Sequence, residues 1–147
     1  MRNTIRTLTP AAVVALAGQL FAGGFYLQLG NPEASPEAKK LNAVVTIKAA
    51  GCHDPALARL TATAIGVVNG ERREIPLKVQ PLSTPGMFAL AQQWPKQGRW
   101  VIRLEAENGE QFTSTLVSAG PEGVDRYHDR GEHRRFTAAE IDDMLRP

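Results

Sequence analysis

Short runs in which hydrophobic and polar residues alternate occupy most of the chain between residues 41 and 117. The clearest run begins at Trp100 and places Ile102 and Leu104 on the same face of an extended chain. A period of two is typical of a β-strand that buries one face. Together with the run that follows Phe25, the pattern predicts about seven strands, at 25–29, 41–49, 60–68, 74–80, 87–93, 100–107 and 111–117.

Turn signals separate these runs, and two of them are the Asn-Gly pairs Asn69-Gly70 and Asn108-Gly109. Asn-Gly favours a two-residue hairpin, because both central residues of a type I′ turn need a positive φ. Long helical patterns do not occur between the runs, which disfavours a parallel α/β sheet. The sequence therefore predicts an all-β fold: an Ig-like antiparallel β-sandwich of about seven strands with a short C-terminal helix.

The predicted helix lies near the end of the chain, where the residues TAAE at 137–140 form a capping-box signature. Phe136 and Ile141 occupy the two positions of a hydrophobic staple, and Met144 and Leu145 continue the same face. A helix of roughly nine residues is marginal alone. We therefore expect these four apolar side chains to dock either on the sandwich itself or on a partner protein.

The first residues of the chain have the pattern of an export signal. Arg2 and Arg6 precede an apolar run at 11–21, and small residues offer cleavage sites after Ala17 or Ala22, of which Ala22 is preferred. The alternative is a retained membrane anchor, because residues 10–29 are about long enough to span a bilayer.

Polar interruptions at Gln19 and Gln28 argue against this anchor. The predicted organisation is a signal peptide at 1–22, an Ig-like domain at 23–120, and a charged, exposed tail at 121–147 that ends in the helix. This organisation predicts a periplasmic or secreted protein.

The charge balance bears on the class of partner. The chain has 17 Lys+Arg and 15 Asp+Glu, and the segment 1–22 contains two arginines and no acidic residue, so the remainder has 15 of each sign. Nucleic-acid binding needs an excess of basic residues that can contact the phosphates. Because the charges of the remainder balance, we expect no nucleic-acid binding. The single cysteine, Cys52, cannot form an intramolecular disulfide, so core burial must supply the stability.

Motifs that carry catalysis are missing from the sequence: it has no Gly-x-Ser-x-Gly, no His-Glu-x-x-His and no Cys-x-x-Cys. We therefore predict that the protein is not an enzyme. The most unusual run is GCHDP at 51–55, where Cys52 and His53 are the soft ligand types that copper and zinc prefer. Two adjacent ligands cannot close a tetrahedral site, and His128 and His133 could complete one only by folding back. A structural cysteine beside a loop-shaping histidine is the simpler interpretation.

The two tryptophans flank a tight turn and receive different predictions. Trp100 is in register with Ile102 and Leu104, which favours the core. Trp94 precedes Pro95, and we expect it to be the more exposed ring and a candidate contact for a partner.

Two strand motifs carry a resemblance to a known group. PGMF at 85–88 followed by GRWVIRL at 98–104 resembles the small exported Ig-like domains of the YtkA-like kind. The run at 51–55 is also similar to that of uncharacterised exported bacterial proteins. The resemblance implies an exported β-sandwich, and some members of the group are accessory proteins for copper delivery or cytochrome oxidase assembly. Those proteins typically carry clusters of methionine and histidine, whereas this chain has three of each.

These observations lead to two functional hypotheses of different classes. The favoured one is an exported, non-enzymatic β-sandwich without a cofactor that serves as a binding or accessory module for an envelope protein. The alternative is a copper-binding or thiol-redox accessory protein that uses Cys52 and His53. In either case we expect membrane contact only through an uncleaved signal segment.

Overall fold

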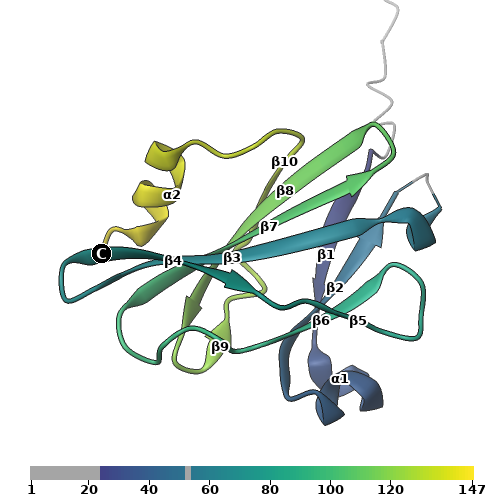
Figure 1. The fold of residues 1–147 in the computed structure, drawn as a ribbon, viewed down its shortest axis with the longest axis horizontal. Helices are drawn as coiled ribbons and strands as arrows, with labels where there is room; N and C mark the ends of the chain where they lie inside the picture. Colours follow the sequence, from purple (N-terminus) through teal and green to yellow (C-terminus); the bar gives the residue numbers. More distant parts are fainter. Residues whose placement is uncertain (1–23, 52–53) are drawn as a thin grey trace, which may run out of the picture.

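Two antiparallel sheets pack face to face and form a β-sandwich (Figure 1). The computed structural model describes residues 24–51 and 54–147. The first sheet has the order β1-β2-β6-β5, with bounds Tyr26–Gly30, Ala43–Ala50, Met87–Ala91 and Gln80–Pro81. The second sheet has the order β10-β8-β7-β3-β4, with bounds Arg130–Glu132, Gln111–Gly120, Arg99–Asn108, Arg59–Val68 and Glu71–Leu77. A further short strand, β9 (Gly123–Val124), also pairs with β8.

The strand order is that of the immunoglobulin fold. The first sheet matches the ABED sheet, and β8-β7-β3 match strands G, F and C, with β4 added beside β3. The predicted Ig-like antiparallel sandwich is therefore confirmed. The seven predicted strands correspond to β1–β4 and β6–β8, and β5, β9 and β10 are additional strands of two or three residues.

The core lies between the two sheets, where alternate side chains of each strand point inward. Ile47 from β2 and Trp100, Ile102 and Leu104 from β7 are almost completely buried there. The inward placement predicted for Trp100 is thus confirmed. Its indole N–H donates to the backbone oxygen of Gln97 at 2.9 Å, which satisfies the one polar atom of the buried ring.

The two Asn-Gly pairs behave differently. Asn69 and Gly70 both have positive φ, 51° and 79°, and they form the predicted two-residue turn between β3 and β4. The prediction for Asn108-Gly109 is wrong by one residue, because Asn108 is still paired in the ladder and the turn consists of 109–110. Asn108 is buried, and its side-chain amide donates to the backbone oxygen of Asp54 at 2.9 Å, which holds it in the strand.

Short helical turns connect several of the strands. The 3₁₀ turn η1 (Pro32–Ala34) and the helix α1 (Pro36–Lys40) follow β1, and the 3₁₀ turn η2 (Pro55–Leu57) precedes β3. The N-cap of α1 is Ser35, whose hydroxyl accepts from the Ala38 backbone N–H at 3.2 Å. This agrees with the Ser-Pro-Glu order at 35–37, which is typical of a helix start.

The C-terminal helix α2 (Ala138–Leu145) lies on the outer face of the second sheet (Figure 1). The predicted capping box is present, because the Thr137 hydroxyl accepts from the Glu140 N–H and the Glu140 carboxylate accepts from the Thr137 N–H. The helix buries a second hydrophobic cluster that consists of Ile65, Val101, Leu116, Phe136 and Ile141. The sequence left open whether this helix docks on the sandwich or on a partner protein. In the structure it docks on the sandwich.

The segment between β8 and α2 is attached to the second sheet by its backbone. Most side chains of residues 121–135 are exposed, as the sequence predicted. Their backbone, however, pairs with β8 at 123–124 and again at 130–132. Pairing along a sheet edge requires no apolar side chain, which explains why the hydrophobic pattern did not indicate these two strands.

The predicted signal peptide at 1–22, its cleavage sites and the anchor alternative lie outside the described residues. Within the part of the chain that the structure describes, no helix is both long enough and apolar enough to cross a bilayer.

Candidate binding groove

A shallow groove of about 580 Å³ lies where the start of β1, the end of β2 and two connections meet. The connections are those between β2 and β3 and between β5 and β6. The side chains that define the groove are those of Tyr26, Lys48, Ala50, Pro55, Pro85 and Met87. The groove therefore brings Gly51 and Pro55 of the first motif together with Pro85 and Met87 of the second, although the two motifs are far apart in the sequence.

Gly86 determines how closely these two motifs approach. It is buried, its φ is +75°, and a Cβ atom at this position would lie 2.5 Å from Pro55 Cβ. Its backbone oxygen accepts from the Ala49 N–H at 2.8 Å, so the turn is fixed to β2 as well. Only glycine combines this conformation with such a close contact. Close packing at Gly86 therefore holds the two connections together beside the groove.

The pairing of β1, β2 and β6 aligns the side chains at the groove. Lys48 is in register with Gln28 on one side and with Met87 on the other, and Tyr26 is in register with Ala50. Residues directly opposite one another in an antiparallel ladder point to the same face. Since Ile47 and Ala49 point into the core, Lys48 and Ala50 point outward.

The chemistry of the groove is that of a binding surface. It presents an aromatic ring that is 47% exposed, a thioether and one ammonium group, and its described lining contains no carboxylate. Apolar walls with one fixed charge orient a ligand that has an apolar part and an acidic part. The sequence pattern did not single out Tyr26 or Lys48, although alternation in FYLQL at 25–29 places Tyr26 opposite in direction to the buried Phe25 and Leu27.

The predicted metal ligands Cys52 and His53 lie outside the described residues. Their neighbours Gly51 and Pro55 line the groove. His133 lies at the same end of the sandwich as Gly51, because Gly24 is close to both of these residues. A Cβ atom on Gly24 would lie 3.3 Å from His133 Cε1, and one on Gly51 would lie 3.0 Å from the Gly24 oxygen. Among the described residues, no group of three or more His, Cys, Asp or Glu side chains could hold a metal ion.

The expected exposure of Trp94 is wrong. Its side chain is 4% exposed and belongs to the main core, and its indole N–H donates to the backbone oxygen of Gly120 at 3.2 Å. The turn at 94–98 folds the ring inward against the end of β8, where it finds both apolar contacts and an acceptor.

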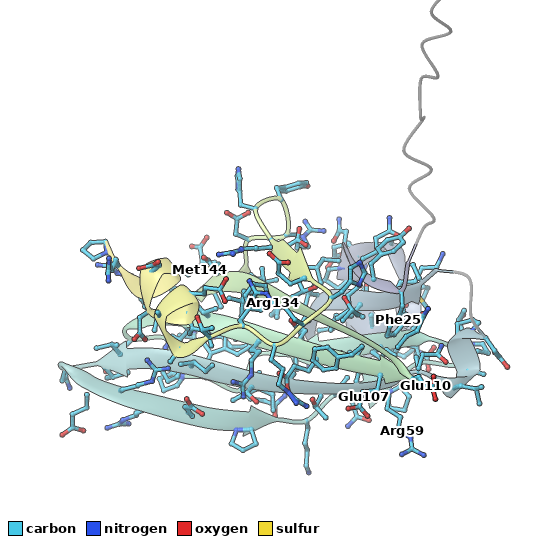
Figure 2. All side chains as sticks on the ribbon, turned by 90° about the horizontal axis from the view of Figure 1, so that it is seen from above. Phe25, Arg59, Glu107, Glu110, Arg134 and Met144 are labelled. Carbon is cyan, nitrogen blue, oxygen red and sulfur yellow. The ribbon has the colours of Figure 1, made fainter. Side chains whose placement is uncertain are left out.

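The four helix residues that were predicted as partner contacts all take part in the docking of α2. Phe136 and Ile141 are 6% and 2% exposed, and Met144 and Leu145 are partly buried against the same cluster. Figure 2 shows Met144 on α2, above the second sheet. In this conformation the apolar face of the helix is occupied by its own sandwich.

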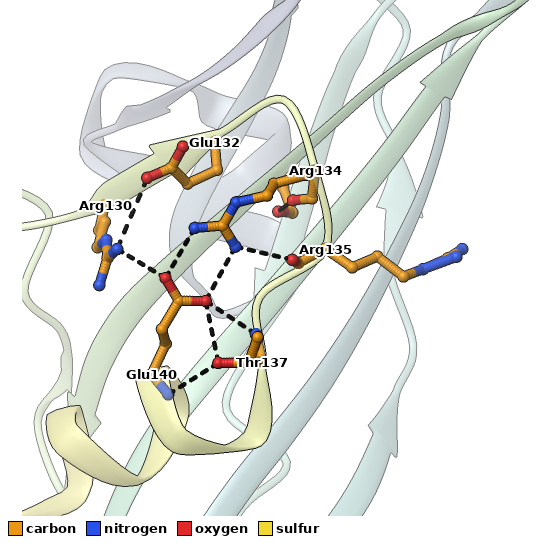
Figure 3. Close-up of polar contacts among 7 residues, drawn as sticks. Arg130, Glu132, Arg134, Arg135, Thr137 and Glu140 are labelled. Carbon is orange, nitrogen blue, oxygen red and sulfur yellow. Dashed lines mark hydrogen bonds and ion pairs between the residues drawn. The ribbon is translucent and has the colours of Figure 1, made fainter.

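A polar cluster around Glu140 fixes the N-terminus of α2 (Figure 3). The Glu140 carboxylate accepts from Arg130 and Arg134 at 2.8 Å and from the Thr137 N–H at 2.9 Å. The hydrogen bonds from Arg134, followed by the one from Thr137, hold the pKa of Glu140 far below its ordinary value of 4.5. Both guanidinium groups also lie over the Phe136 ring, at 5.3 and 5.8 Å from its centroid. The role of this cluster is structural, because it holds the start of the helix in place.

Comparisons of the chain with protein-family models, with curated proteins and with solved structures found no match. The interpretation of the groove therefore rests on its own residues and their geometry.

Proposed function

We propose that this protein is an exported, non-enzymatic binding or accessory module of the cell envelope, and that the groove at 26, 48 and 87 is its ligand site. The observation that supports this proposal is the open groove with one cation, one exposed aromatic ring and no carboxylate in its described lining. Its ligand is an acidic segment of an envelope protein with an apolar neighbour for Tyr26. The resemblance to small exported domains of the YtkA-like kind is consistent with the same class of function.

The test exchanges the charge of the groove. Immobilised wild-type protein, Lys48→Glu and Lys96→Glu are exposed to the same envelope extract, and the retained proteins are quantified by mass spectrometry. Lys96 is the matched control, because it is an exposed lysine in the turn at 94–98 and does not line the groove. We expect a set of proteins that wild type and Lys96→Glu retain and Lys48→Glu loses. Equal retention by all three proteins would contradict the proposal.

The second candidate function is a copper-binding or thiol-redox accessory role for Cys52 and His53. The observation that favours it is the placement of two further soft or borderline ligands, Met87 in the groove and His133 beside Gly24, at the end where the flanking Gly51 lies. Copper would be held by thiolate, imidazole and thioether groups.

Equilibrium dialysis against Cu(I) tests this candidate with wild type, Cys52→Ser, Met87→Leu and His133→Gln. Stoichiometric copper on wild type and weaker retention by all three variants would support it. No retention by wild type would exclude copper as the ligand, and equal retention by every variant would exclude these three residues as its ligands.

A further inference from the structure

The free edge of the second sheet contains an excursion that we call the tip loop, residues 125–129. Val124 of β9 pairs with Ala119, and Arg130 of β10 pairs with Leu116, both on β8. The five residues 125–129 therefore lie opposite only two residues of β8, 117 and 118. The extra residues cannot all pair, so the chain leaves the ladder here. Figure 2 shows the connection between β9 and β10 projecting from the sandwich.

Asp125 braces the tip loop through three hydrogen bonds. Its backbone N–H donates to the Ser118 oxygen at 2.9 Å, which ties the start of the loop to β8. One carboxylate oxygen accepts from the Tyr127 N–H at 3.2 Å, and the other lies 2.8 Å from His128 Nδ1. These two hydrogen bonds, first that of His128, lower the pKa of Asp125 below its ordinary value, so the anchoring carboxylate stays charged.

The side chains at the tip are of the types that dominate protein interfaces. Tyr127 is 82% exposed, the most exposed large hydrophobic residue among those described. The Arg126 guanidinium lies over its ring at 5.5 Å from the centroid. A single exposed aromatic residue needs no explanation. A Tyr and an Arg stacked on a braced loop are different, because hot spots are enriched in both and a rigid loop loses little entropy on binding.

We propose that the tip loop is a second docking element, which inserts Tyr127 into an apolar pocket of a partner protein while Arg126 pairs with a carboxylate at the pocket rim. The charge next to the Tyr127 ring supports this partner chemistry. Asp125 is already engaged with His128. Within the described residues neither Arg126 nor Asp129 has an ion-pair partner, and of these two it is the Arg126 guanidinium that lies over the Tyr127 ring. The proposal rests on the proposed function as a binding module, but on a different surface.

The test is site-specific photo-crosslinking of the full chain in its native envelope, with the photoreactive residue at position 127 or at position 110. Glu110 is the control because it is an exposed turn residue at the β7–β8 hairpin (Figure 2). We expect a discrete protein adduct from position 127 and none from position 110. Arg126→Glu should reduce the adduct at least about tenfold, and Arg126→Lys should largely retain it.

Several outcomes would overturn the tip loop as a docking element: no adduct at 127, the same adduct at 110, or an adduct unchanged by Arg126→Glu. An adduct of twice the chain mass would identify a second copy instead of another protein. The excursion would then serve only to protect the sheet edge from pairing, or to join copies. If Lys48-dependent retention persists without a tip adduct, only the tip proposal fails; loss of both contradicts the proposed function as well.

A second variant separates a positioning role from contact. Asp125→Ala removes both carboxylate hydrogen bonds but leaves the Tyr127 and Arg126 side chains intact. We expect a weaker adduct with an unchanged melting temperature, because the bonds lost are confined to the exposed loop. An adduct as strong as that of wild type would show that bracing of the loop contributes nothing.

Discussion

The outer faces of the two sheets differ in composition and in what covers them. On the second sheet, Ile65, Val101 and Leu116 form an apolar surface, and α2 packs over it. On the first sheet, the paired outward residues Gln28 and Lys48 are polar and exposed, and the groove there is open. Both sheets are antiparallel, and the side chains at their outward positions account for this difference.

Under the proposed function, this difference separates stability from binding within one sandwich. An apolar outer face must be covered, since exposed hydrophobic area of this kind favours aggregation. The capping box and the Glu140 cluster supply the cover by holding a short helix in place. Around Lys48 the outer face of the first sheet has no such cover, and the groove stays exposed there. Each of the following predictions tests this division.

The largest expected effect is that of Leu116→Ala. Leu116 of β8 is completely buried beneath Phe136 and Ile141. Its truncation should therefore lower the free energy of unfolding by about 2–5 kcal/mol. The matched change on the other face, Met87→Ala, removes a half-buried side chain and should cost about 1 kcal/mol or less. Urea unfolding measures both values. Similar losses for the two variants would show that the faces do not differ in this way.

A smaller effect is expected from the N-cap of α2. Thr137→Ala removes the hydroxyl that accepts from the Glu140 N–H at 3.3 Å, and the loss should be about 0.5–2 kcal/mol. Thr137→Ser keeps the oxygen and should remain close to wild type. Hydrogen exchange should locate the change in the α2 amides, whereas those of β2 and β6 stay protected. Equal loosening of both sheets would mean that the helix is not an independent cover.

The docking of α2 should also depend on pH. The folded-state pKa of Glu140 lies below its ordinary value of 4.5, so its contribution to stability is complete above that value and declines as the pH falls below it. Hydrogen exchange of α2 should therefore accelerate at acidic pH, relative to β2. In Glu140→Gln the charge is absent at every pH, and α2 should show a weaker dependence. A wild-type helix with flat exchange protection down to strongly acidic pH would contradict this assignment.

Local patterns predicted the covered face well and the open one poorly. The capping box, the staple and the apolar stripe all lie within ten residues, so the sequence alone indicated α2 and where it begins. The long strands have a clear period of two, and this pattern predicted the sandwich. The strands β5, β9 and β10 have two or three residues each, which is too short for any periodicity to appear.

The groove and the position of Trp94 could not be predicted because both depend on contacts between distant segments. Gly86 meets Pro55 only after the sandwich has formed, and the Trp94 indole finds its acceptor at Gly120, 26 residues away. A residue beside a proline in a turn is exposed or buried according to what the turn packs against. The sequence analysis noted the runs at 51–55 and 85–88, but no pattern in them indicates that Pro55 and Gly86 meet.

The smallest expected effect concerns the groove itself. Tyr26 is half exposed at an outward position of the edge strand β1, so Tyr26→Ala should change the free energy of unfolding by about 0.5 kcal/mol or less. Lys48→Glu alters an exposed side chain at an outward position and should leave the urea midpoint close to that of wild type.

Both variants should nevertheless lose the ligands that wild type retains. If the open face is the ligand site, its side chains should affect binding but not stability. Leu116 on the covered face should affect stability but not binding. A large loss of stability in Tyr26→Ala or Lys48→Glu would assign the groove side chains to the architecture of the first sheet. The two outer faces would then both be structural, and the ligand site would have to lie elsewhere.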